Sequence, residues 1–203
     1  MFAAMYDPMS ARAEKAGLAG HRKKLLTQAR GRVLEIGGGT GANLPYFDSG
    51  VEEVVFVEPE EPMARRLERK LARSAVQGHI VRAPAEELPF EDASFDAVVS
   101  TLVLCTVSDQ GRVLAEVHRV LKPGGKLLFL EHVRSEDEKL ARWQDRLNGL
   151  NRVMAHGCNC NRATLENISS AGFELGNVER DRFPKAPPLV RPLVAGAAER
   201  VAA

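Results

Sequence analysis

The sequence predicts an α/β fold built on a mainly parallel sheet. Short runs rich in β-branched residues alternate with segments of helical periodicity, which is typical of strands joined by crossover helices. One run, FDAVVS at residues 95–100, is almost continuously apolar, as expected of a strand covered on both faces. The sequence contains no internal repeat or low-complexity tract, so residues 1–203 are expected to form a single domain.

The elements of the first half follow in the order that such a fold requires. Residues 32–36 (RVLEI) form a first strand that the following glycines end, and residues 53–57 (EVVFV) form a second. A helix begins near Pro62, and its apolar residues recur every four positions at Met63, Leu67 and Leu71. Residues 79–82 form a short third strand before the fourth strand at 95–100.

The second half contains three more strands. Asp109 is the expected N-cap of a helix whose apolar residues form a broad stripe: Val113, Leu114, Val117, Val120 and Leu121. Pro123-Gly124-Gly125 ends this helix. The remaining elements are a fifth strand at 126–132, helices at 136–154 and 162–171, and final strands at 173–180 and 189–198.

Composition excludes several classes of protein. The 203 residues carry 28 Lys+Arg and 27 Asp+Glu, and this net charge of +1 disfavours a dedicated nucleic-acid binder. The 44% of hydrophobic residues excludes intrinsic disorder. No apolar run approaches the roughly 20 residues that a bilayer span needs. The three cysteines do not make a disulfide framework, so a cytoplasmic protein without an integral membrane segment is expected.

The most informative segment is EIGGGTG at residues 35–41. It leaves a strand and is expected to open a helix, so that a ligand can approach the backbone closely. GGGTGA also satisfies the dinucleotide pattern G-x-G-x-x-G/A, and Glu58 lies where a ribose-binding acid belongs. A nicotinamide nucleotide and another adenosine-bearing cofactor therefore both fit these residues. Glu35 favours a cationic cofactor, because its charge would repel a pyrophosphate.

Downstream motifs point to one family. EIGGGTG, an acid that closes the second strand, AEELPFEDASFDAVVS and VLKPGGKL occur in this order over roughly residues 30–135. Together they resemble the class I S-adenosylmethionine-dependent methyltransferases. The resemblance implies a Rossmann-like sheet of seven strands, mostly parallel with the last strand antiparallel, and helices on both faces. It also implies that S-adenosylmethionine lies across the ends of the first two strands.

The same resemblance assigns roles to particular residues. Glu35 would favour the cationic end of the cofactor, and Glu58 would accept both ribose hydroxyls. The backbone would approach the cofactor at Gly37, Gly39 and Gly41. Many relatives hold the adenine amine with an Asp that is Pro84 here. The remaining cofactor contacts are expected from Pro59, Met63, Ala85, Glu86, Thr101 and Leu102.

A narrower resemblance concerns the family that includes the mammalian alkyl-thiol methyltransferases. It rests on TLVLCTV (101–107), LEHV (130–133), HGCNCNRATLE (156–166) and LVRP (189–192). The segment YDPMSARAEKAGL resembles bacterial members, and we expect residues 1–30 to form an amino-terminal helical cap. The mammalian proteins carry a hydrophobic membrane-anchoring leader, and we expect none here.

The predicted activity is methyl transfer from S-adenosylmethionine to a small, apolar acceptor, with a thiol as the first hypothesis. Quinone-type carbon or oxygen methylation and lipid nitrogen methylation remain open. From other classes, an NAD(P)-dependent oxidoreductase and a non-catalytic cofactor-binding module also remain open. His132 ends the fifth strand at the ligand-binding edge and is the candidate catalytic base, with a purely structural histidine as the equal alternative.

Two further features receive a structural interpretation. His156, Cys158 and Cys160, with Cys105, have an H-x-C-x-C spacing that lacks the C-x-x-C pairs of structural zinc sites, so no metal is expected. Trp143, the only tryptophan, is expected to pack the long helix onto the sheet.

Overall fold

A seven-stranded sheet lies at the centre of the protein in the computed structural model, which describes residues 11–155, 157–183 and 185–201. The strand order is β3-β2-β1-β4-β5-β7-β6, and among these strands β7 alone runs in the direction opposite to the other six. The bounds are β1 (Gly31–Ile36), β2 (Val51–Val57), β3 (Gly78–Val81), β4 (Phe95–Thr101), β5 (Leu121–His132), β6 (Phe173–Arg182) and β7 (Pro192–Arg200). This order confirms the predicted Rossmann-like fold.

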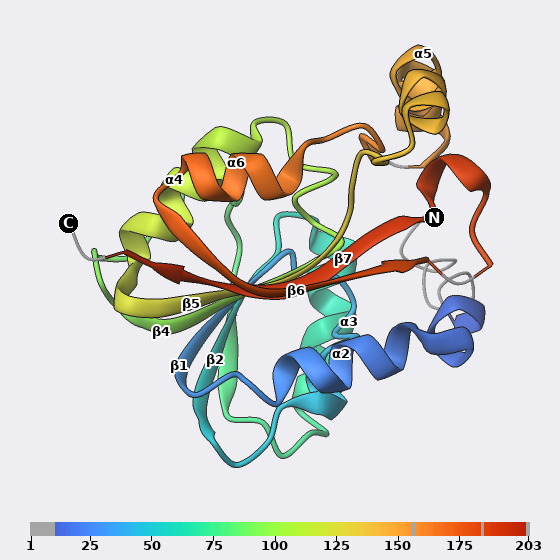
Figure 1. The fold of residues 1–203 in the computed structure, drawn as a ribbon. Helices are drawn as coiled ribbons and strands as arrows, with labels where there is room; N and C mark the ends of the chain where they lie inside the picture. The colour runs from blue at the N-terminus through green and yellow to red at the C-terminus, as the bar shows by residue number, and fades with distance from the viewer. Residues whose placement is uncertain (1–10, 156, 184, 202–203) are drawn as a thin grey trace.

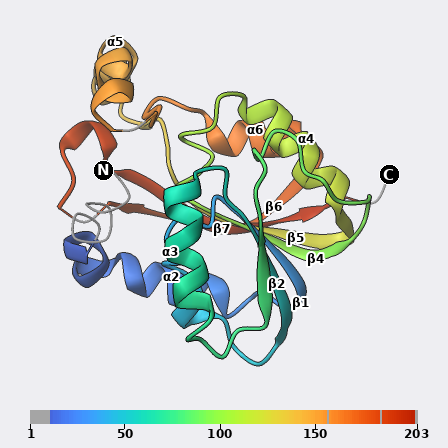
Figure 2. The same cartoon turned by 180° about the vertical axis from the view of Figure 1, so that it is seen from behind.

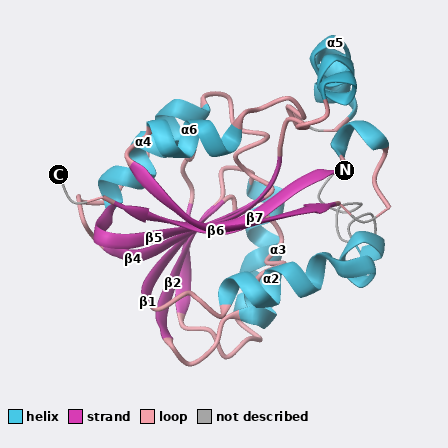
Figure 3. Cartoon of the chain, in the orientation of Figure 1, coloured by secondary structure: helices cyan, strands magenta, loops and turns pink. Residues whose placement is uncertain are grey.

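Helices cover both faces of the sheet. In Figure 1, α4 and α6 lie on one face and α2 and α3 on the other, and Figure 2 shows the same from behind. The α-helices are α2 (Ala19–Leu26), α3 (Glu61–Leu71), α4 (Gln110–Val120), α5 (Glu138–Met154) and α6 (Thr164–Ser170). A short π-helix, η1 (Glu14–Leu18), precedes α2, and η2 (Leu44–Tyr46) and η3 (Pro188–Val190) are single 3-10 turns. Figure 3 separates these helices from the loops by colour.

The hydrophobic core has two parts, one on each side of the sheet. Successive side chains of a strand point to opposite faces, so Val33 and Leu34 of β1 belong to different clusters although both are fully buried. Val113 and Leu114 of α4 pack in the cluster of Leu34, and Leu67 of α3 packs in the cluster of Val33. Burial on both faces explains the continuous apolar runs in the central strands.

Three sequence predictions need correction. Helix α4 ends at Val120, and Leu121, expected on its apolar stripe, is already extended and begins β5, which includes Pro123-Gly124-Gly125. The helix expected after the glycine segment is only the single 3-10 turn η2. Pro45 lacks the backbone N–H that a helix starting in the glycine segment would need at this position, and Phe47 is already extended. The last strand, expected from residue 189, begins at Pro192 after the turn η3.

The prediction for Trp143 was also wrong. Trp143 is 54% exposed, and α5 instead buries Ala141 and Gln144 against the rest of the protein. Helical periodicity located α5 correctly, but a period of 3.6 residues does not say which face meets the protein.

Candidate functional site

The glycine segment leaves β1 as a turn that only glycine accommodates easily. Gly37 and Gly39 have φ of 59° and 55°, in the left-handed region that L-residues seldom adopt. A Cβ on Gly37 would lie 2.5 Å from Cγ2 of Val103, whereas a Cβ on Gly39 would meet only a backbone oxygen at 3.8 Å. The backbone of Gly39 therefore borders open space, where a ligand can approach it.

Glu58 joins this turn to the start of α3. Its Oε2 accepts a 2.8 Å hydrogen bond from the Gly39 backbone N–H, and its Oε1 accepts a 2.9 Å bond from the Glu60 N–H. Glu58 is only 5% exposed, and burial raises the pKa of its carboxyl. Each carboxylate oxygen keeps a further acceptor position. The carboxylate is thus fixed by the backbone and still able to accept hydroxyl donors.

Glu35 is a buried acid with an unused oxygen. Its Oε1 accepts a 3.1 Å hydrogen bond from Nδ2 of Asn43, but its Oε2 has no partner among the described residues. Burial raises the pKa of Glu35 to about 8, against the opposing charge of Arg22. A buried oxygen without a donor is costly, so this site favours a cation or donor beside Glu35.

Arg22 reaches the same place from α2. Its Nη1 donates to Oδ1 of Asn43 at 2.8 Å and to Oγ1 of Thr101 at 2.9 Å, and Asn43 also donates to that hydroxyl at 3.0 Å. Arg22 is 2% exposed and pairs with Glu14 through its Nε at 3.0 Å. Sequence analysis missed Arg22 and Asn43, since neither stands in a recognisable motif.

A second buried acid holds the loop after β4. Glu131 of β5 accepts hydrogen bonds from the Ser100 hydroxyl at 2.7 Å and from the N–H groups of Val103 and Leu104, both at 3.1 Å. In the same loop Leu102 has φ of 61°, a conformation that costs a non-glycine residue roughly 1 kcal/mol. Sequence analysis missed Glu131, although an acid inside an apolar strand was the signal that identified Glu35.

Residues 157–162, the described part of the segment HGCNCNR, contact the same loop. The backbone N–H of Asn159 donates to the Cys105 carbonyl at 2.7 Å, and Arg162 donates to the Val107 carbonyl at 2.6 Å and to that of Leu104. His156 lies outside the described residues. Within the described ranges, no group of three or more His, Cys, Asp or Glu side chains is arranged to hold a metal. The segment therefore supports the loop after β4.

The residues expected around adenine have different environments. Met63 and Ala85 are buried, at 7% exposure each, whereas Pro59 is exposed and its carbonyl accepts a hydrogen bond from Arg82. Oε1 of Glu86 accepts a 2.8 Å bond from the Ser108 N–H, in the loop before α4. Glu86 thus already supports this loop, which leaves its contact with adenine a prediction.

His132 lies at the carboxyl end of β5, and burial lowers the pKa of its imidazole to about 4. Its ring packs against Phe183 with a centroid distance of 4.6 Å, and its Nδ1 has no hydrogen-bond partner among the described residues. An imidazole with this pKa is neutral near pH 7 but is a weak base. The base role of His132 remains a prediction, and its burial argues for a modest contribution.

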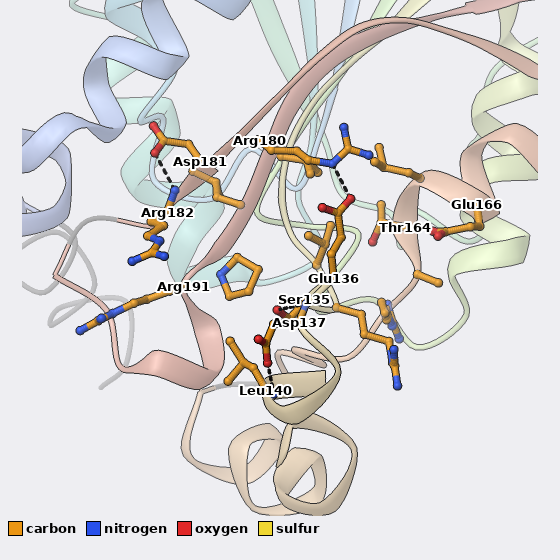
Figure 4. A pocket seen from close by; sticks show the side chains of 18 of the residues that line it. Ser135, Glu136, Asp137, Leu140, Thr164, Glu166, Arg180, Asp181, Arg182 and Arg191 are labelled. Carbon is orange, nitrogen blue, oxygen red and sulfur yellow. Dashed lines mark hydrogen bonds and ion pairs between the residues drawn. The ribbon is translucent and has the colours of Figure 1, made fainter. Parts of the chain in front are cut away.

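A cavity of about 650 Å³ opens beside the end of β5 (Figure 4). It lies between the residues after β5, the start of α6 and the ends of β6 and β7, and Arg180 within it pairs with Glu136 at 2.8 Å. None of its described lining residues is among those that the resemblance assigns to the cofactor. The cavity is therefore separate from the glycine turn, which follows β1 on the other side of β4.

Comparison with known proteins agrees with this arrangement. Residues 34–129 match the methyltransferase domain family. The chain is 34% identical over 168 residues to human thiol S-methyltransferase TMT1A and 37% identical over 167 residues to human TMT1B; these alignments cover 81% and 79% of this chain and 68% of each relative. A ubiquinone/menaquinone biosynthesis C-methyltransferase, UbiE of Marinomonas, is 35% identical over 146 residues, covering 67% of this chain and 58% of that protein.

Solved structures support the fold. An S-adenosylmethionine-dependent methyltransferase from Mesorhizobium loti has a TM-score of 0.68 at 21% identity, over 91% of this chain and 98% of that one. The [4+2]-cyclase SpnF has a TM-score of 0.72 at 20% identity, over 92% of this chain and 80% of that one. At such identities the likeness concerns the fold alone, whereas the sequence relatives identify the family. The chain belongs to the S-adenosylmethionine-dependent methyltransferases, in the family that contains the thiol S-methyltransferases TMT1A and TMT1B.

Among the helices of the described ranges, none has the length and apolar character to cross a bilayer.

Proposed function

We propose that this enzyme binds S-adenosylmethionine across the ends of β1 and β2 and transfers its methyl group to the sulfur of a small, apolar thiol. The observation that carries the cofactor assignment is the pair of buried acids on either side of the glycine turn. Glu58 is fixed by the Gly39 N–H, and Glu35 has an oxygen without a donor among the residues that the structure describes. The first suits ribose hydroxyls, and the second suits the cationic amino acid portion.

The residues of the chain fit this cofactor in a consistent way. Gly37, Gly39 and Gly41, which all have positive φ, would let the backbone lie against it. Pro59, Met63, Ala85 and Glu86 would surround adenine, and Thr101 and Leu102 would lie beneath. The bound cofactor supplies a methyl group that is already an activated electrophile. The chain would then orient the acceptor and exclude water, which can contribute roughly 7 kcal/mol or more.

A thiol suits the surroundings of His132. A few per cent of an ordinary thiol is thiolate near pH 7, so its methylation needs no strong protein base. An amine or phenol acceptor would depend more on a base, and burial lowers the pKa of His132 to about 4. The names of the two human relatives support the same acceptor class.

Quinone-type carbon methylation is the second candidate, because the UbiE relative is 35% identical. A carbon or phenol nucleophile must lose a proton, so this candidate requires a base that His132 supplies poorly. Lipid nitrogen methylation has no such relative among those described. The cofactor-binding module without catalysis and the NAD(P)-dependent oxidoreductase are tested directly below.

We also propose the single domain of residues 1–203 with residues 1–30 as an amino-terminal cap, which the contact of Arg22 with Thr101 supports. The proposed compartment is the cytoplasm, where the three free, buried cysteines would remain reduced. The proposed partner is a small-molecule acceptor and not a nucleic acid, in line with the net charge of +1.

The first experiment is thermal unfolding with S-adenosylhomocysteine, NAD or NADP. A ligand at about 100 times its Kd stabilises by about 2.7 kcal/mol, a Tm increase of roughly 5 to 10 °C for a chain of this size. We expect this increase with S-adenosylhomocysteine only. An increase only with a nicotinamide nucleotide would refute the proposed cofactor.

Acceptors are then compared at saturating S-adenosylmethionine by mass spectrometry of the products. We expect methylation of an alkyl thiol, with little product from a matched alcohol or amine. Product from a quinol alone would replace the thiol with the second candidate. Cofactor binding without turnover of a broad acceptor panel would favour the binding module.

A further inference from the structure

Helix α5 faces the protein with its polar side. The inward stripe consists of the buried Ala141 and Gln144 and the half-buried Asn148 and Asn151, which are spaced as one face of a helix. Gln144 donates to the Leu189 carbonyl at 2.8 Å and accepts from the Ser135 N–H at 2.7 Å. Such side-chain to backbone hydrogen bonds, together with the buried Ala141, attach α5 to the rest of the protein.

The two asparagines continue this polar attachment. Asn148 accepts a 3.1 Å hydrogen bond from the Cys160 N–H, and Asn151 donates to the Cys158 carbonyl at 2.7 Å. The orientation of α5 is therefore fixed along most of its length, and its outward face is a defined surface.

That outward face is apolar. Trp143, Leu150 and Met154 occupy positions i, i+7 and i+11, and they are 54%, 60% and 74% exposed. Val153 beside them is 82% exposed. A surface helix normally turns its large apolar side chains toward the protein, whereas α5 exposes these four. We call this surface, formed by Trp143, Leu150, Val153 and Met154, the α5 apolar stripe.

The α5 apolar stripe is accompanied by positive charge. Helix α5 carries four cationic side chains against two acidic ones, and all four cations are exposed: Lys139, Arg142, Arg146 and Arg152. None of the four has an ion-pair partner among the described residues, whereas Asp145 pairs with Arg134 at 2.7 Å. The guanidinium of Arg146 lies 5.8 Å from the ring centroid of Trp143. Glu138 also has no ion-pair partner among the described residues, so the unpaired charge on this helix is net positive.

The position of α5 leaves its outward face accessible to a broad, flat binding surface. Figures 1 and 2 show α5 standing away from the sheet and its covering helices, at the margin of the molecule. An apolar stripe with tryptophan and with Lys and Arg around it is typical of helices that lie in a membrane interface. We propose that α5 binds the surface of an anionic lipid bilayer, with the α5 apolar stripe at the acyl boundary and its cations at the headgroups.

The test uses the full chain and vesicles of phosphatidylcholine with or without phosphatidylserine. Trp143 is the only tryptophan, so its fluorescence reports directly on this helix. We expect sedimentation with the anionic vesicles, a blue shift of the emission, and weakening of both by salt. No binding and no shift with anionic vesicles would overturn the proposal.

Variants locate the contact. The double variant Leu150→Ser/Val153→Ser should lower partitioning at least about tenfold, because two apolar side chains no longer enter the interface. Arg142→Glu/Arg146→Glu should remove the preference for anionic lipid. Val201→Ser, at another exposed apolar residue, and Arg73→Glu, at an exposed cation after α3, are the matched controls. Circular dichroism and Tm verify that each variant is folded.

Other occupants of the same stripe give different results. A second copy of the chain would produce a dimer that Leu150→Ser/Val153→Ser converts to a monomer, without vesicle binding. A protein partner would leave the isolated chain monomeric and unbound to vesicles. Either result, or vesicle binding that the Leu150→Ser/Val153→Ser variant retains in full, would overturn a lipid contact at α5. The vesicle assay requires no methyl acceptor, so its outcome does not depend on whether the proposed thiol methylation is correct.

Discussion

The Glu58 carboxylate accepts a 2.8 Å hydrogen bond from the backbone N–H of Gly39, which joins the ends of β2 and β1. The bond spans 19 residues of sequence and sets the distance between the acid and the glycine turn. Parallel strands bring their carboxyl ends to one edge of a sheet, and neighbouring strands supply both halves of this site. The acid is thereby positioned before any ligand arrives.

Replacement of Glu58 by alanine should weaken cofactor binding. It removes the proposed ribose acceptor and frees the Gly39 N–H, so the expected loss is about 1.5 to 3 kcal/mol, or roughly 10- to 150-fold in Kd. Calorimetric titration with S-adenosylhomocysteine measures it. Glu60→Ala is the control, because Glu60 donates to Glu58 through its backbone N–H, which this variant keeps. Unchanged affinity in Glu58→Ala would show that the ribose lies elsewhere.

The stability of the ligand-free enzyme should fall as pH rises toward 8. Burial raises the pKa of Glu35 to about 8 from 4.5, so between these values the folded state holds a proton that the unfolded chain has lost. The free energy of unfolding then decreases with pH, by up to about 1.4 kcal/mol per unit. The contribution of Glu35 is complete below pH 4.5 and is lost above about pH 8.

Glu35→Gln tests this dependence. The variant cannot ionise, so it should lack the Glu35 part of the slope and exceed the wild type in stability near pH 8. Urea unfolding at several pH values measures the difference. Glu52→Gln, at an exposed acid of β2, should follow the wild type. Parallel profiles for the wild type and Glu35→Gln would mean that Glu35 does not titrate in this range.

Arg22→Met should disturb the site from α2. The substitution removes the Arg22 donor to the buried Oδ1 of Asn43 and one of the two donors to Oγ1 of Thr101, and the expected destabilisation is about 1 to 3 kcal/mol. It also removes the charge that opposes the high pKa of Glu35, so the affinity for S-adenosylhomocysteine should fall as well. Lys23→Met, at an exposed neighbour on the same helix, should change neither Tm nor affinity. A stable Arg22→Met variant with wild-type affinity would contradict this coupling.

The parts of the site that sequence analysis predicted are those encoded within a few residues. Gly37 and Gly39 are recognisable because a left-handed turn at a strand end requires glycine. Glu58 is recognisable because it closes a strand at a fixed distance from them. The strands and the long helices follow from periodicity in the same local way.

The parts that were missed depend on contacts between distant residues. Arg22 meets Thr101 across 79 residues, and Glu131 meets Ser100 across 31. In sequence, Arg22 is one of several basic residues in a short run, and nothing local distinguishes the one that is buried. The prediction that Trp143 packs against the sheet failed for the same reason, because the polar groups that hold α5 come from other elements.

The final prediction concerns His132 and the acceptor. Because burial lowers the pKa of His132 to about 4, we expect His132→Asn to keep thiol methylation within about threefold of the wild type, with unchanged cofactor affinity. The pH profile of kcat/KM should instead follow the ionisation of the thiol and shift when a more acidic thiol is used. His118→Asn is the matched control, since His118 also packs against a phenylalanine, Phe173, at 5.3 Å. If His132→Asn alone loses activity by about 100-fold or more while both variants keep their Tm, then His132 acts as a base despite its burial.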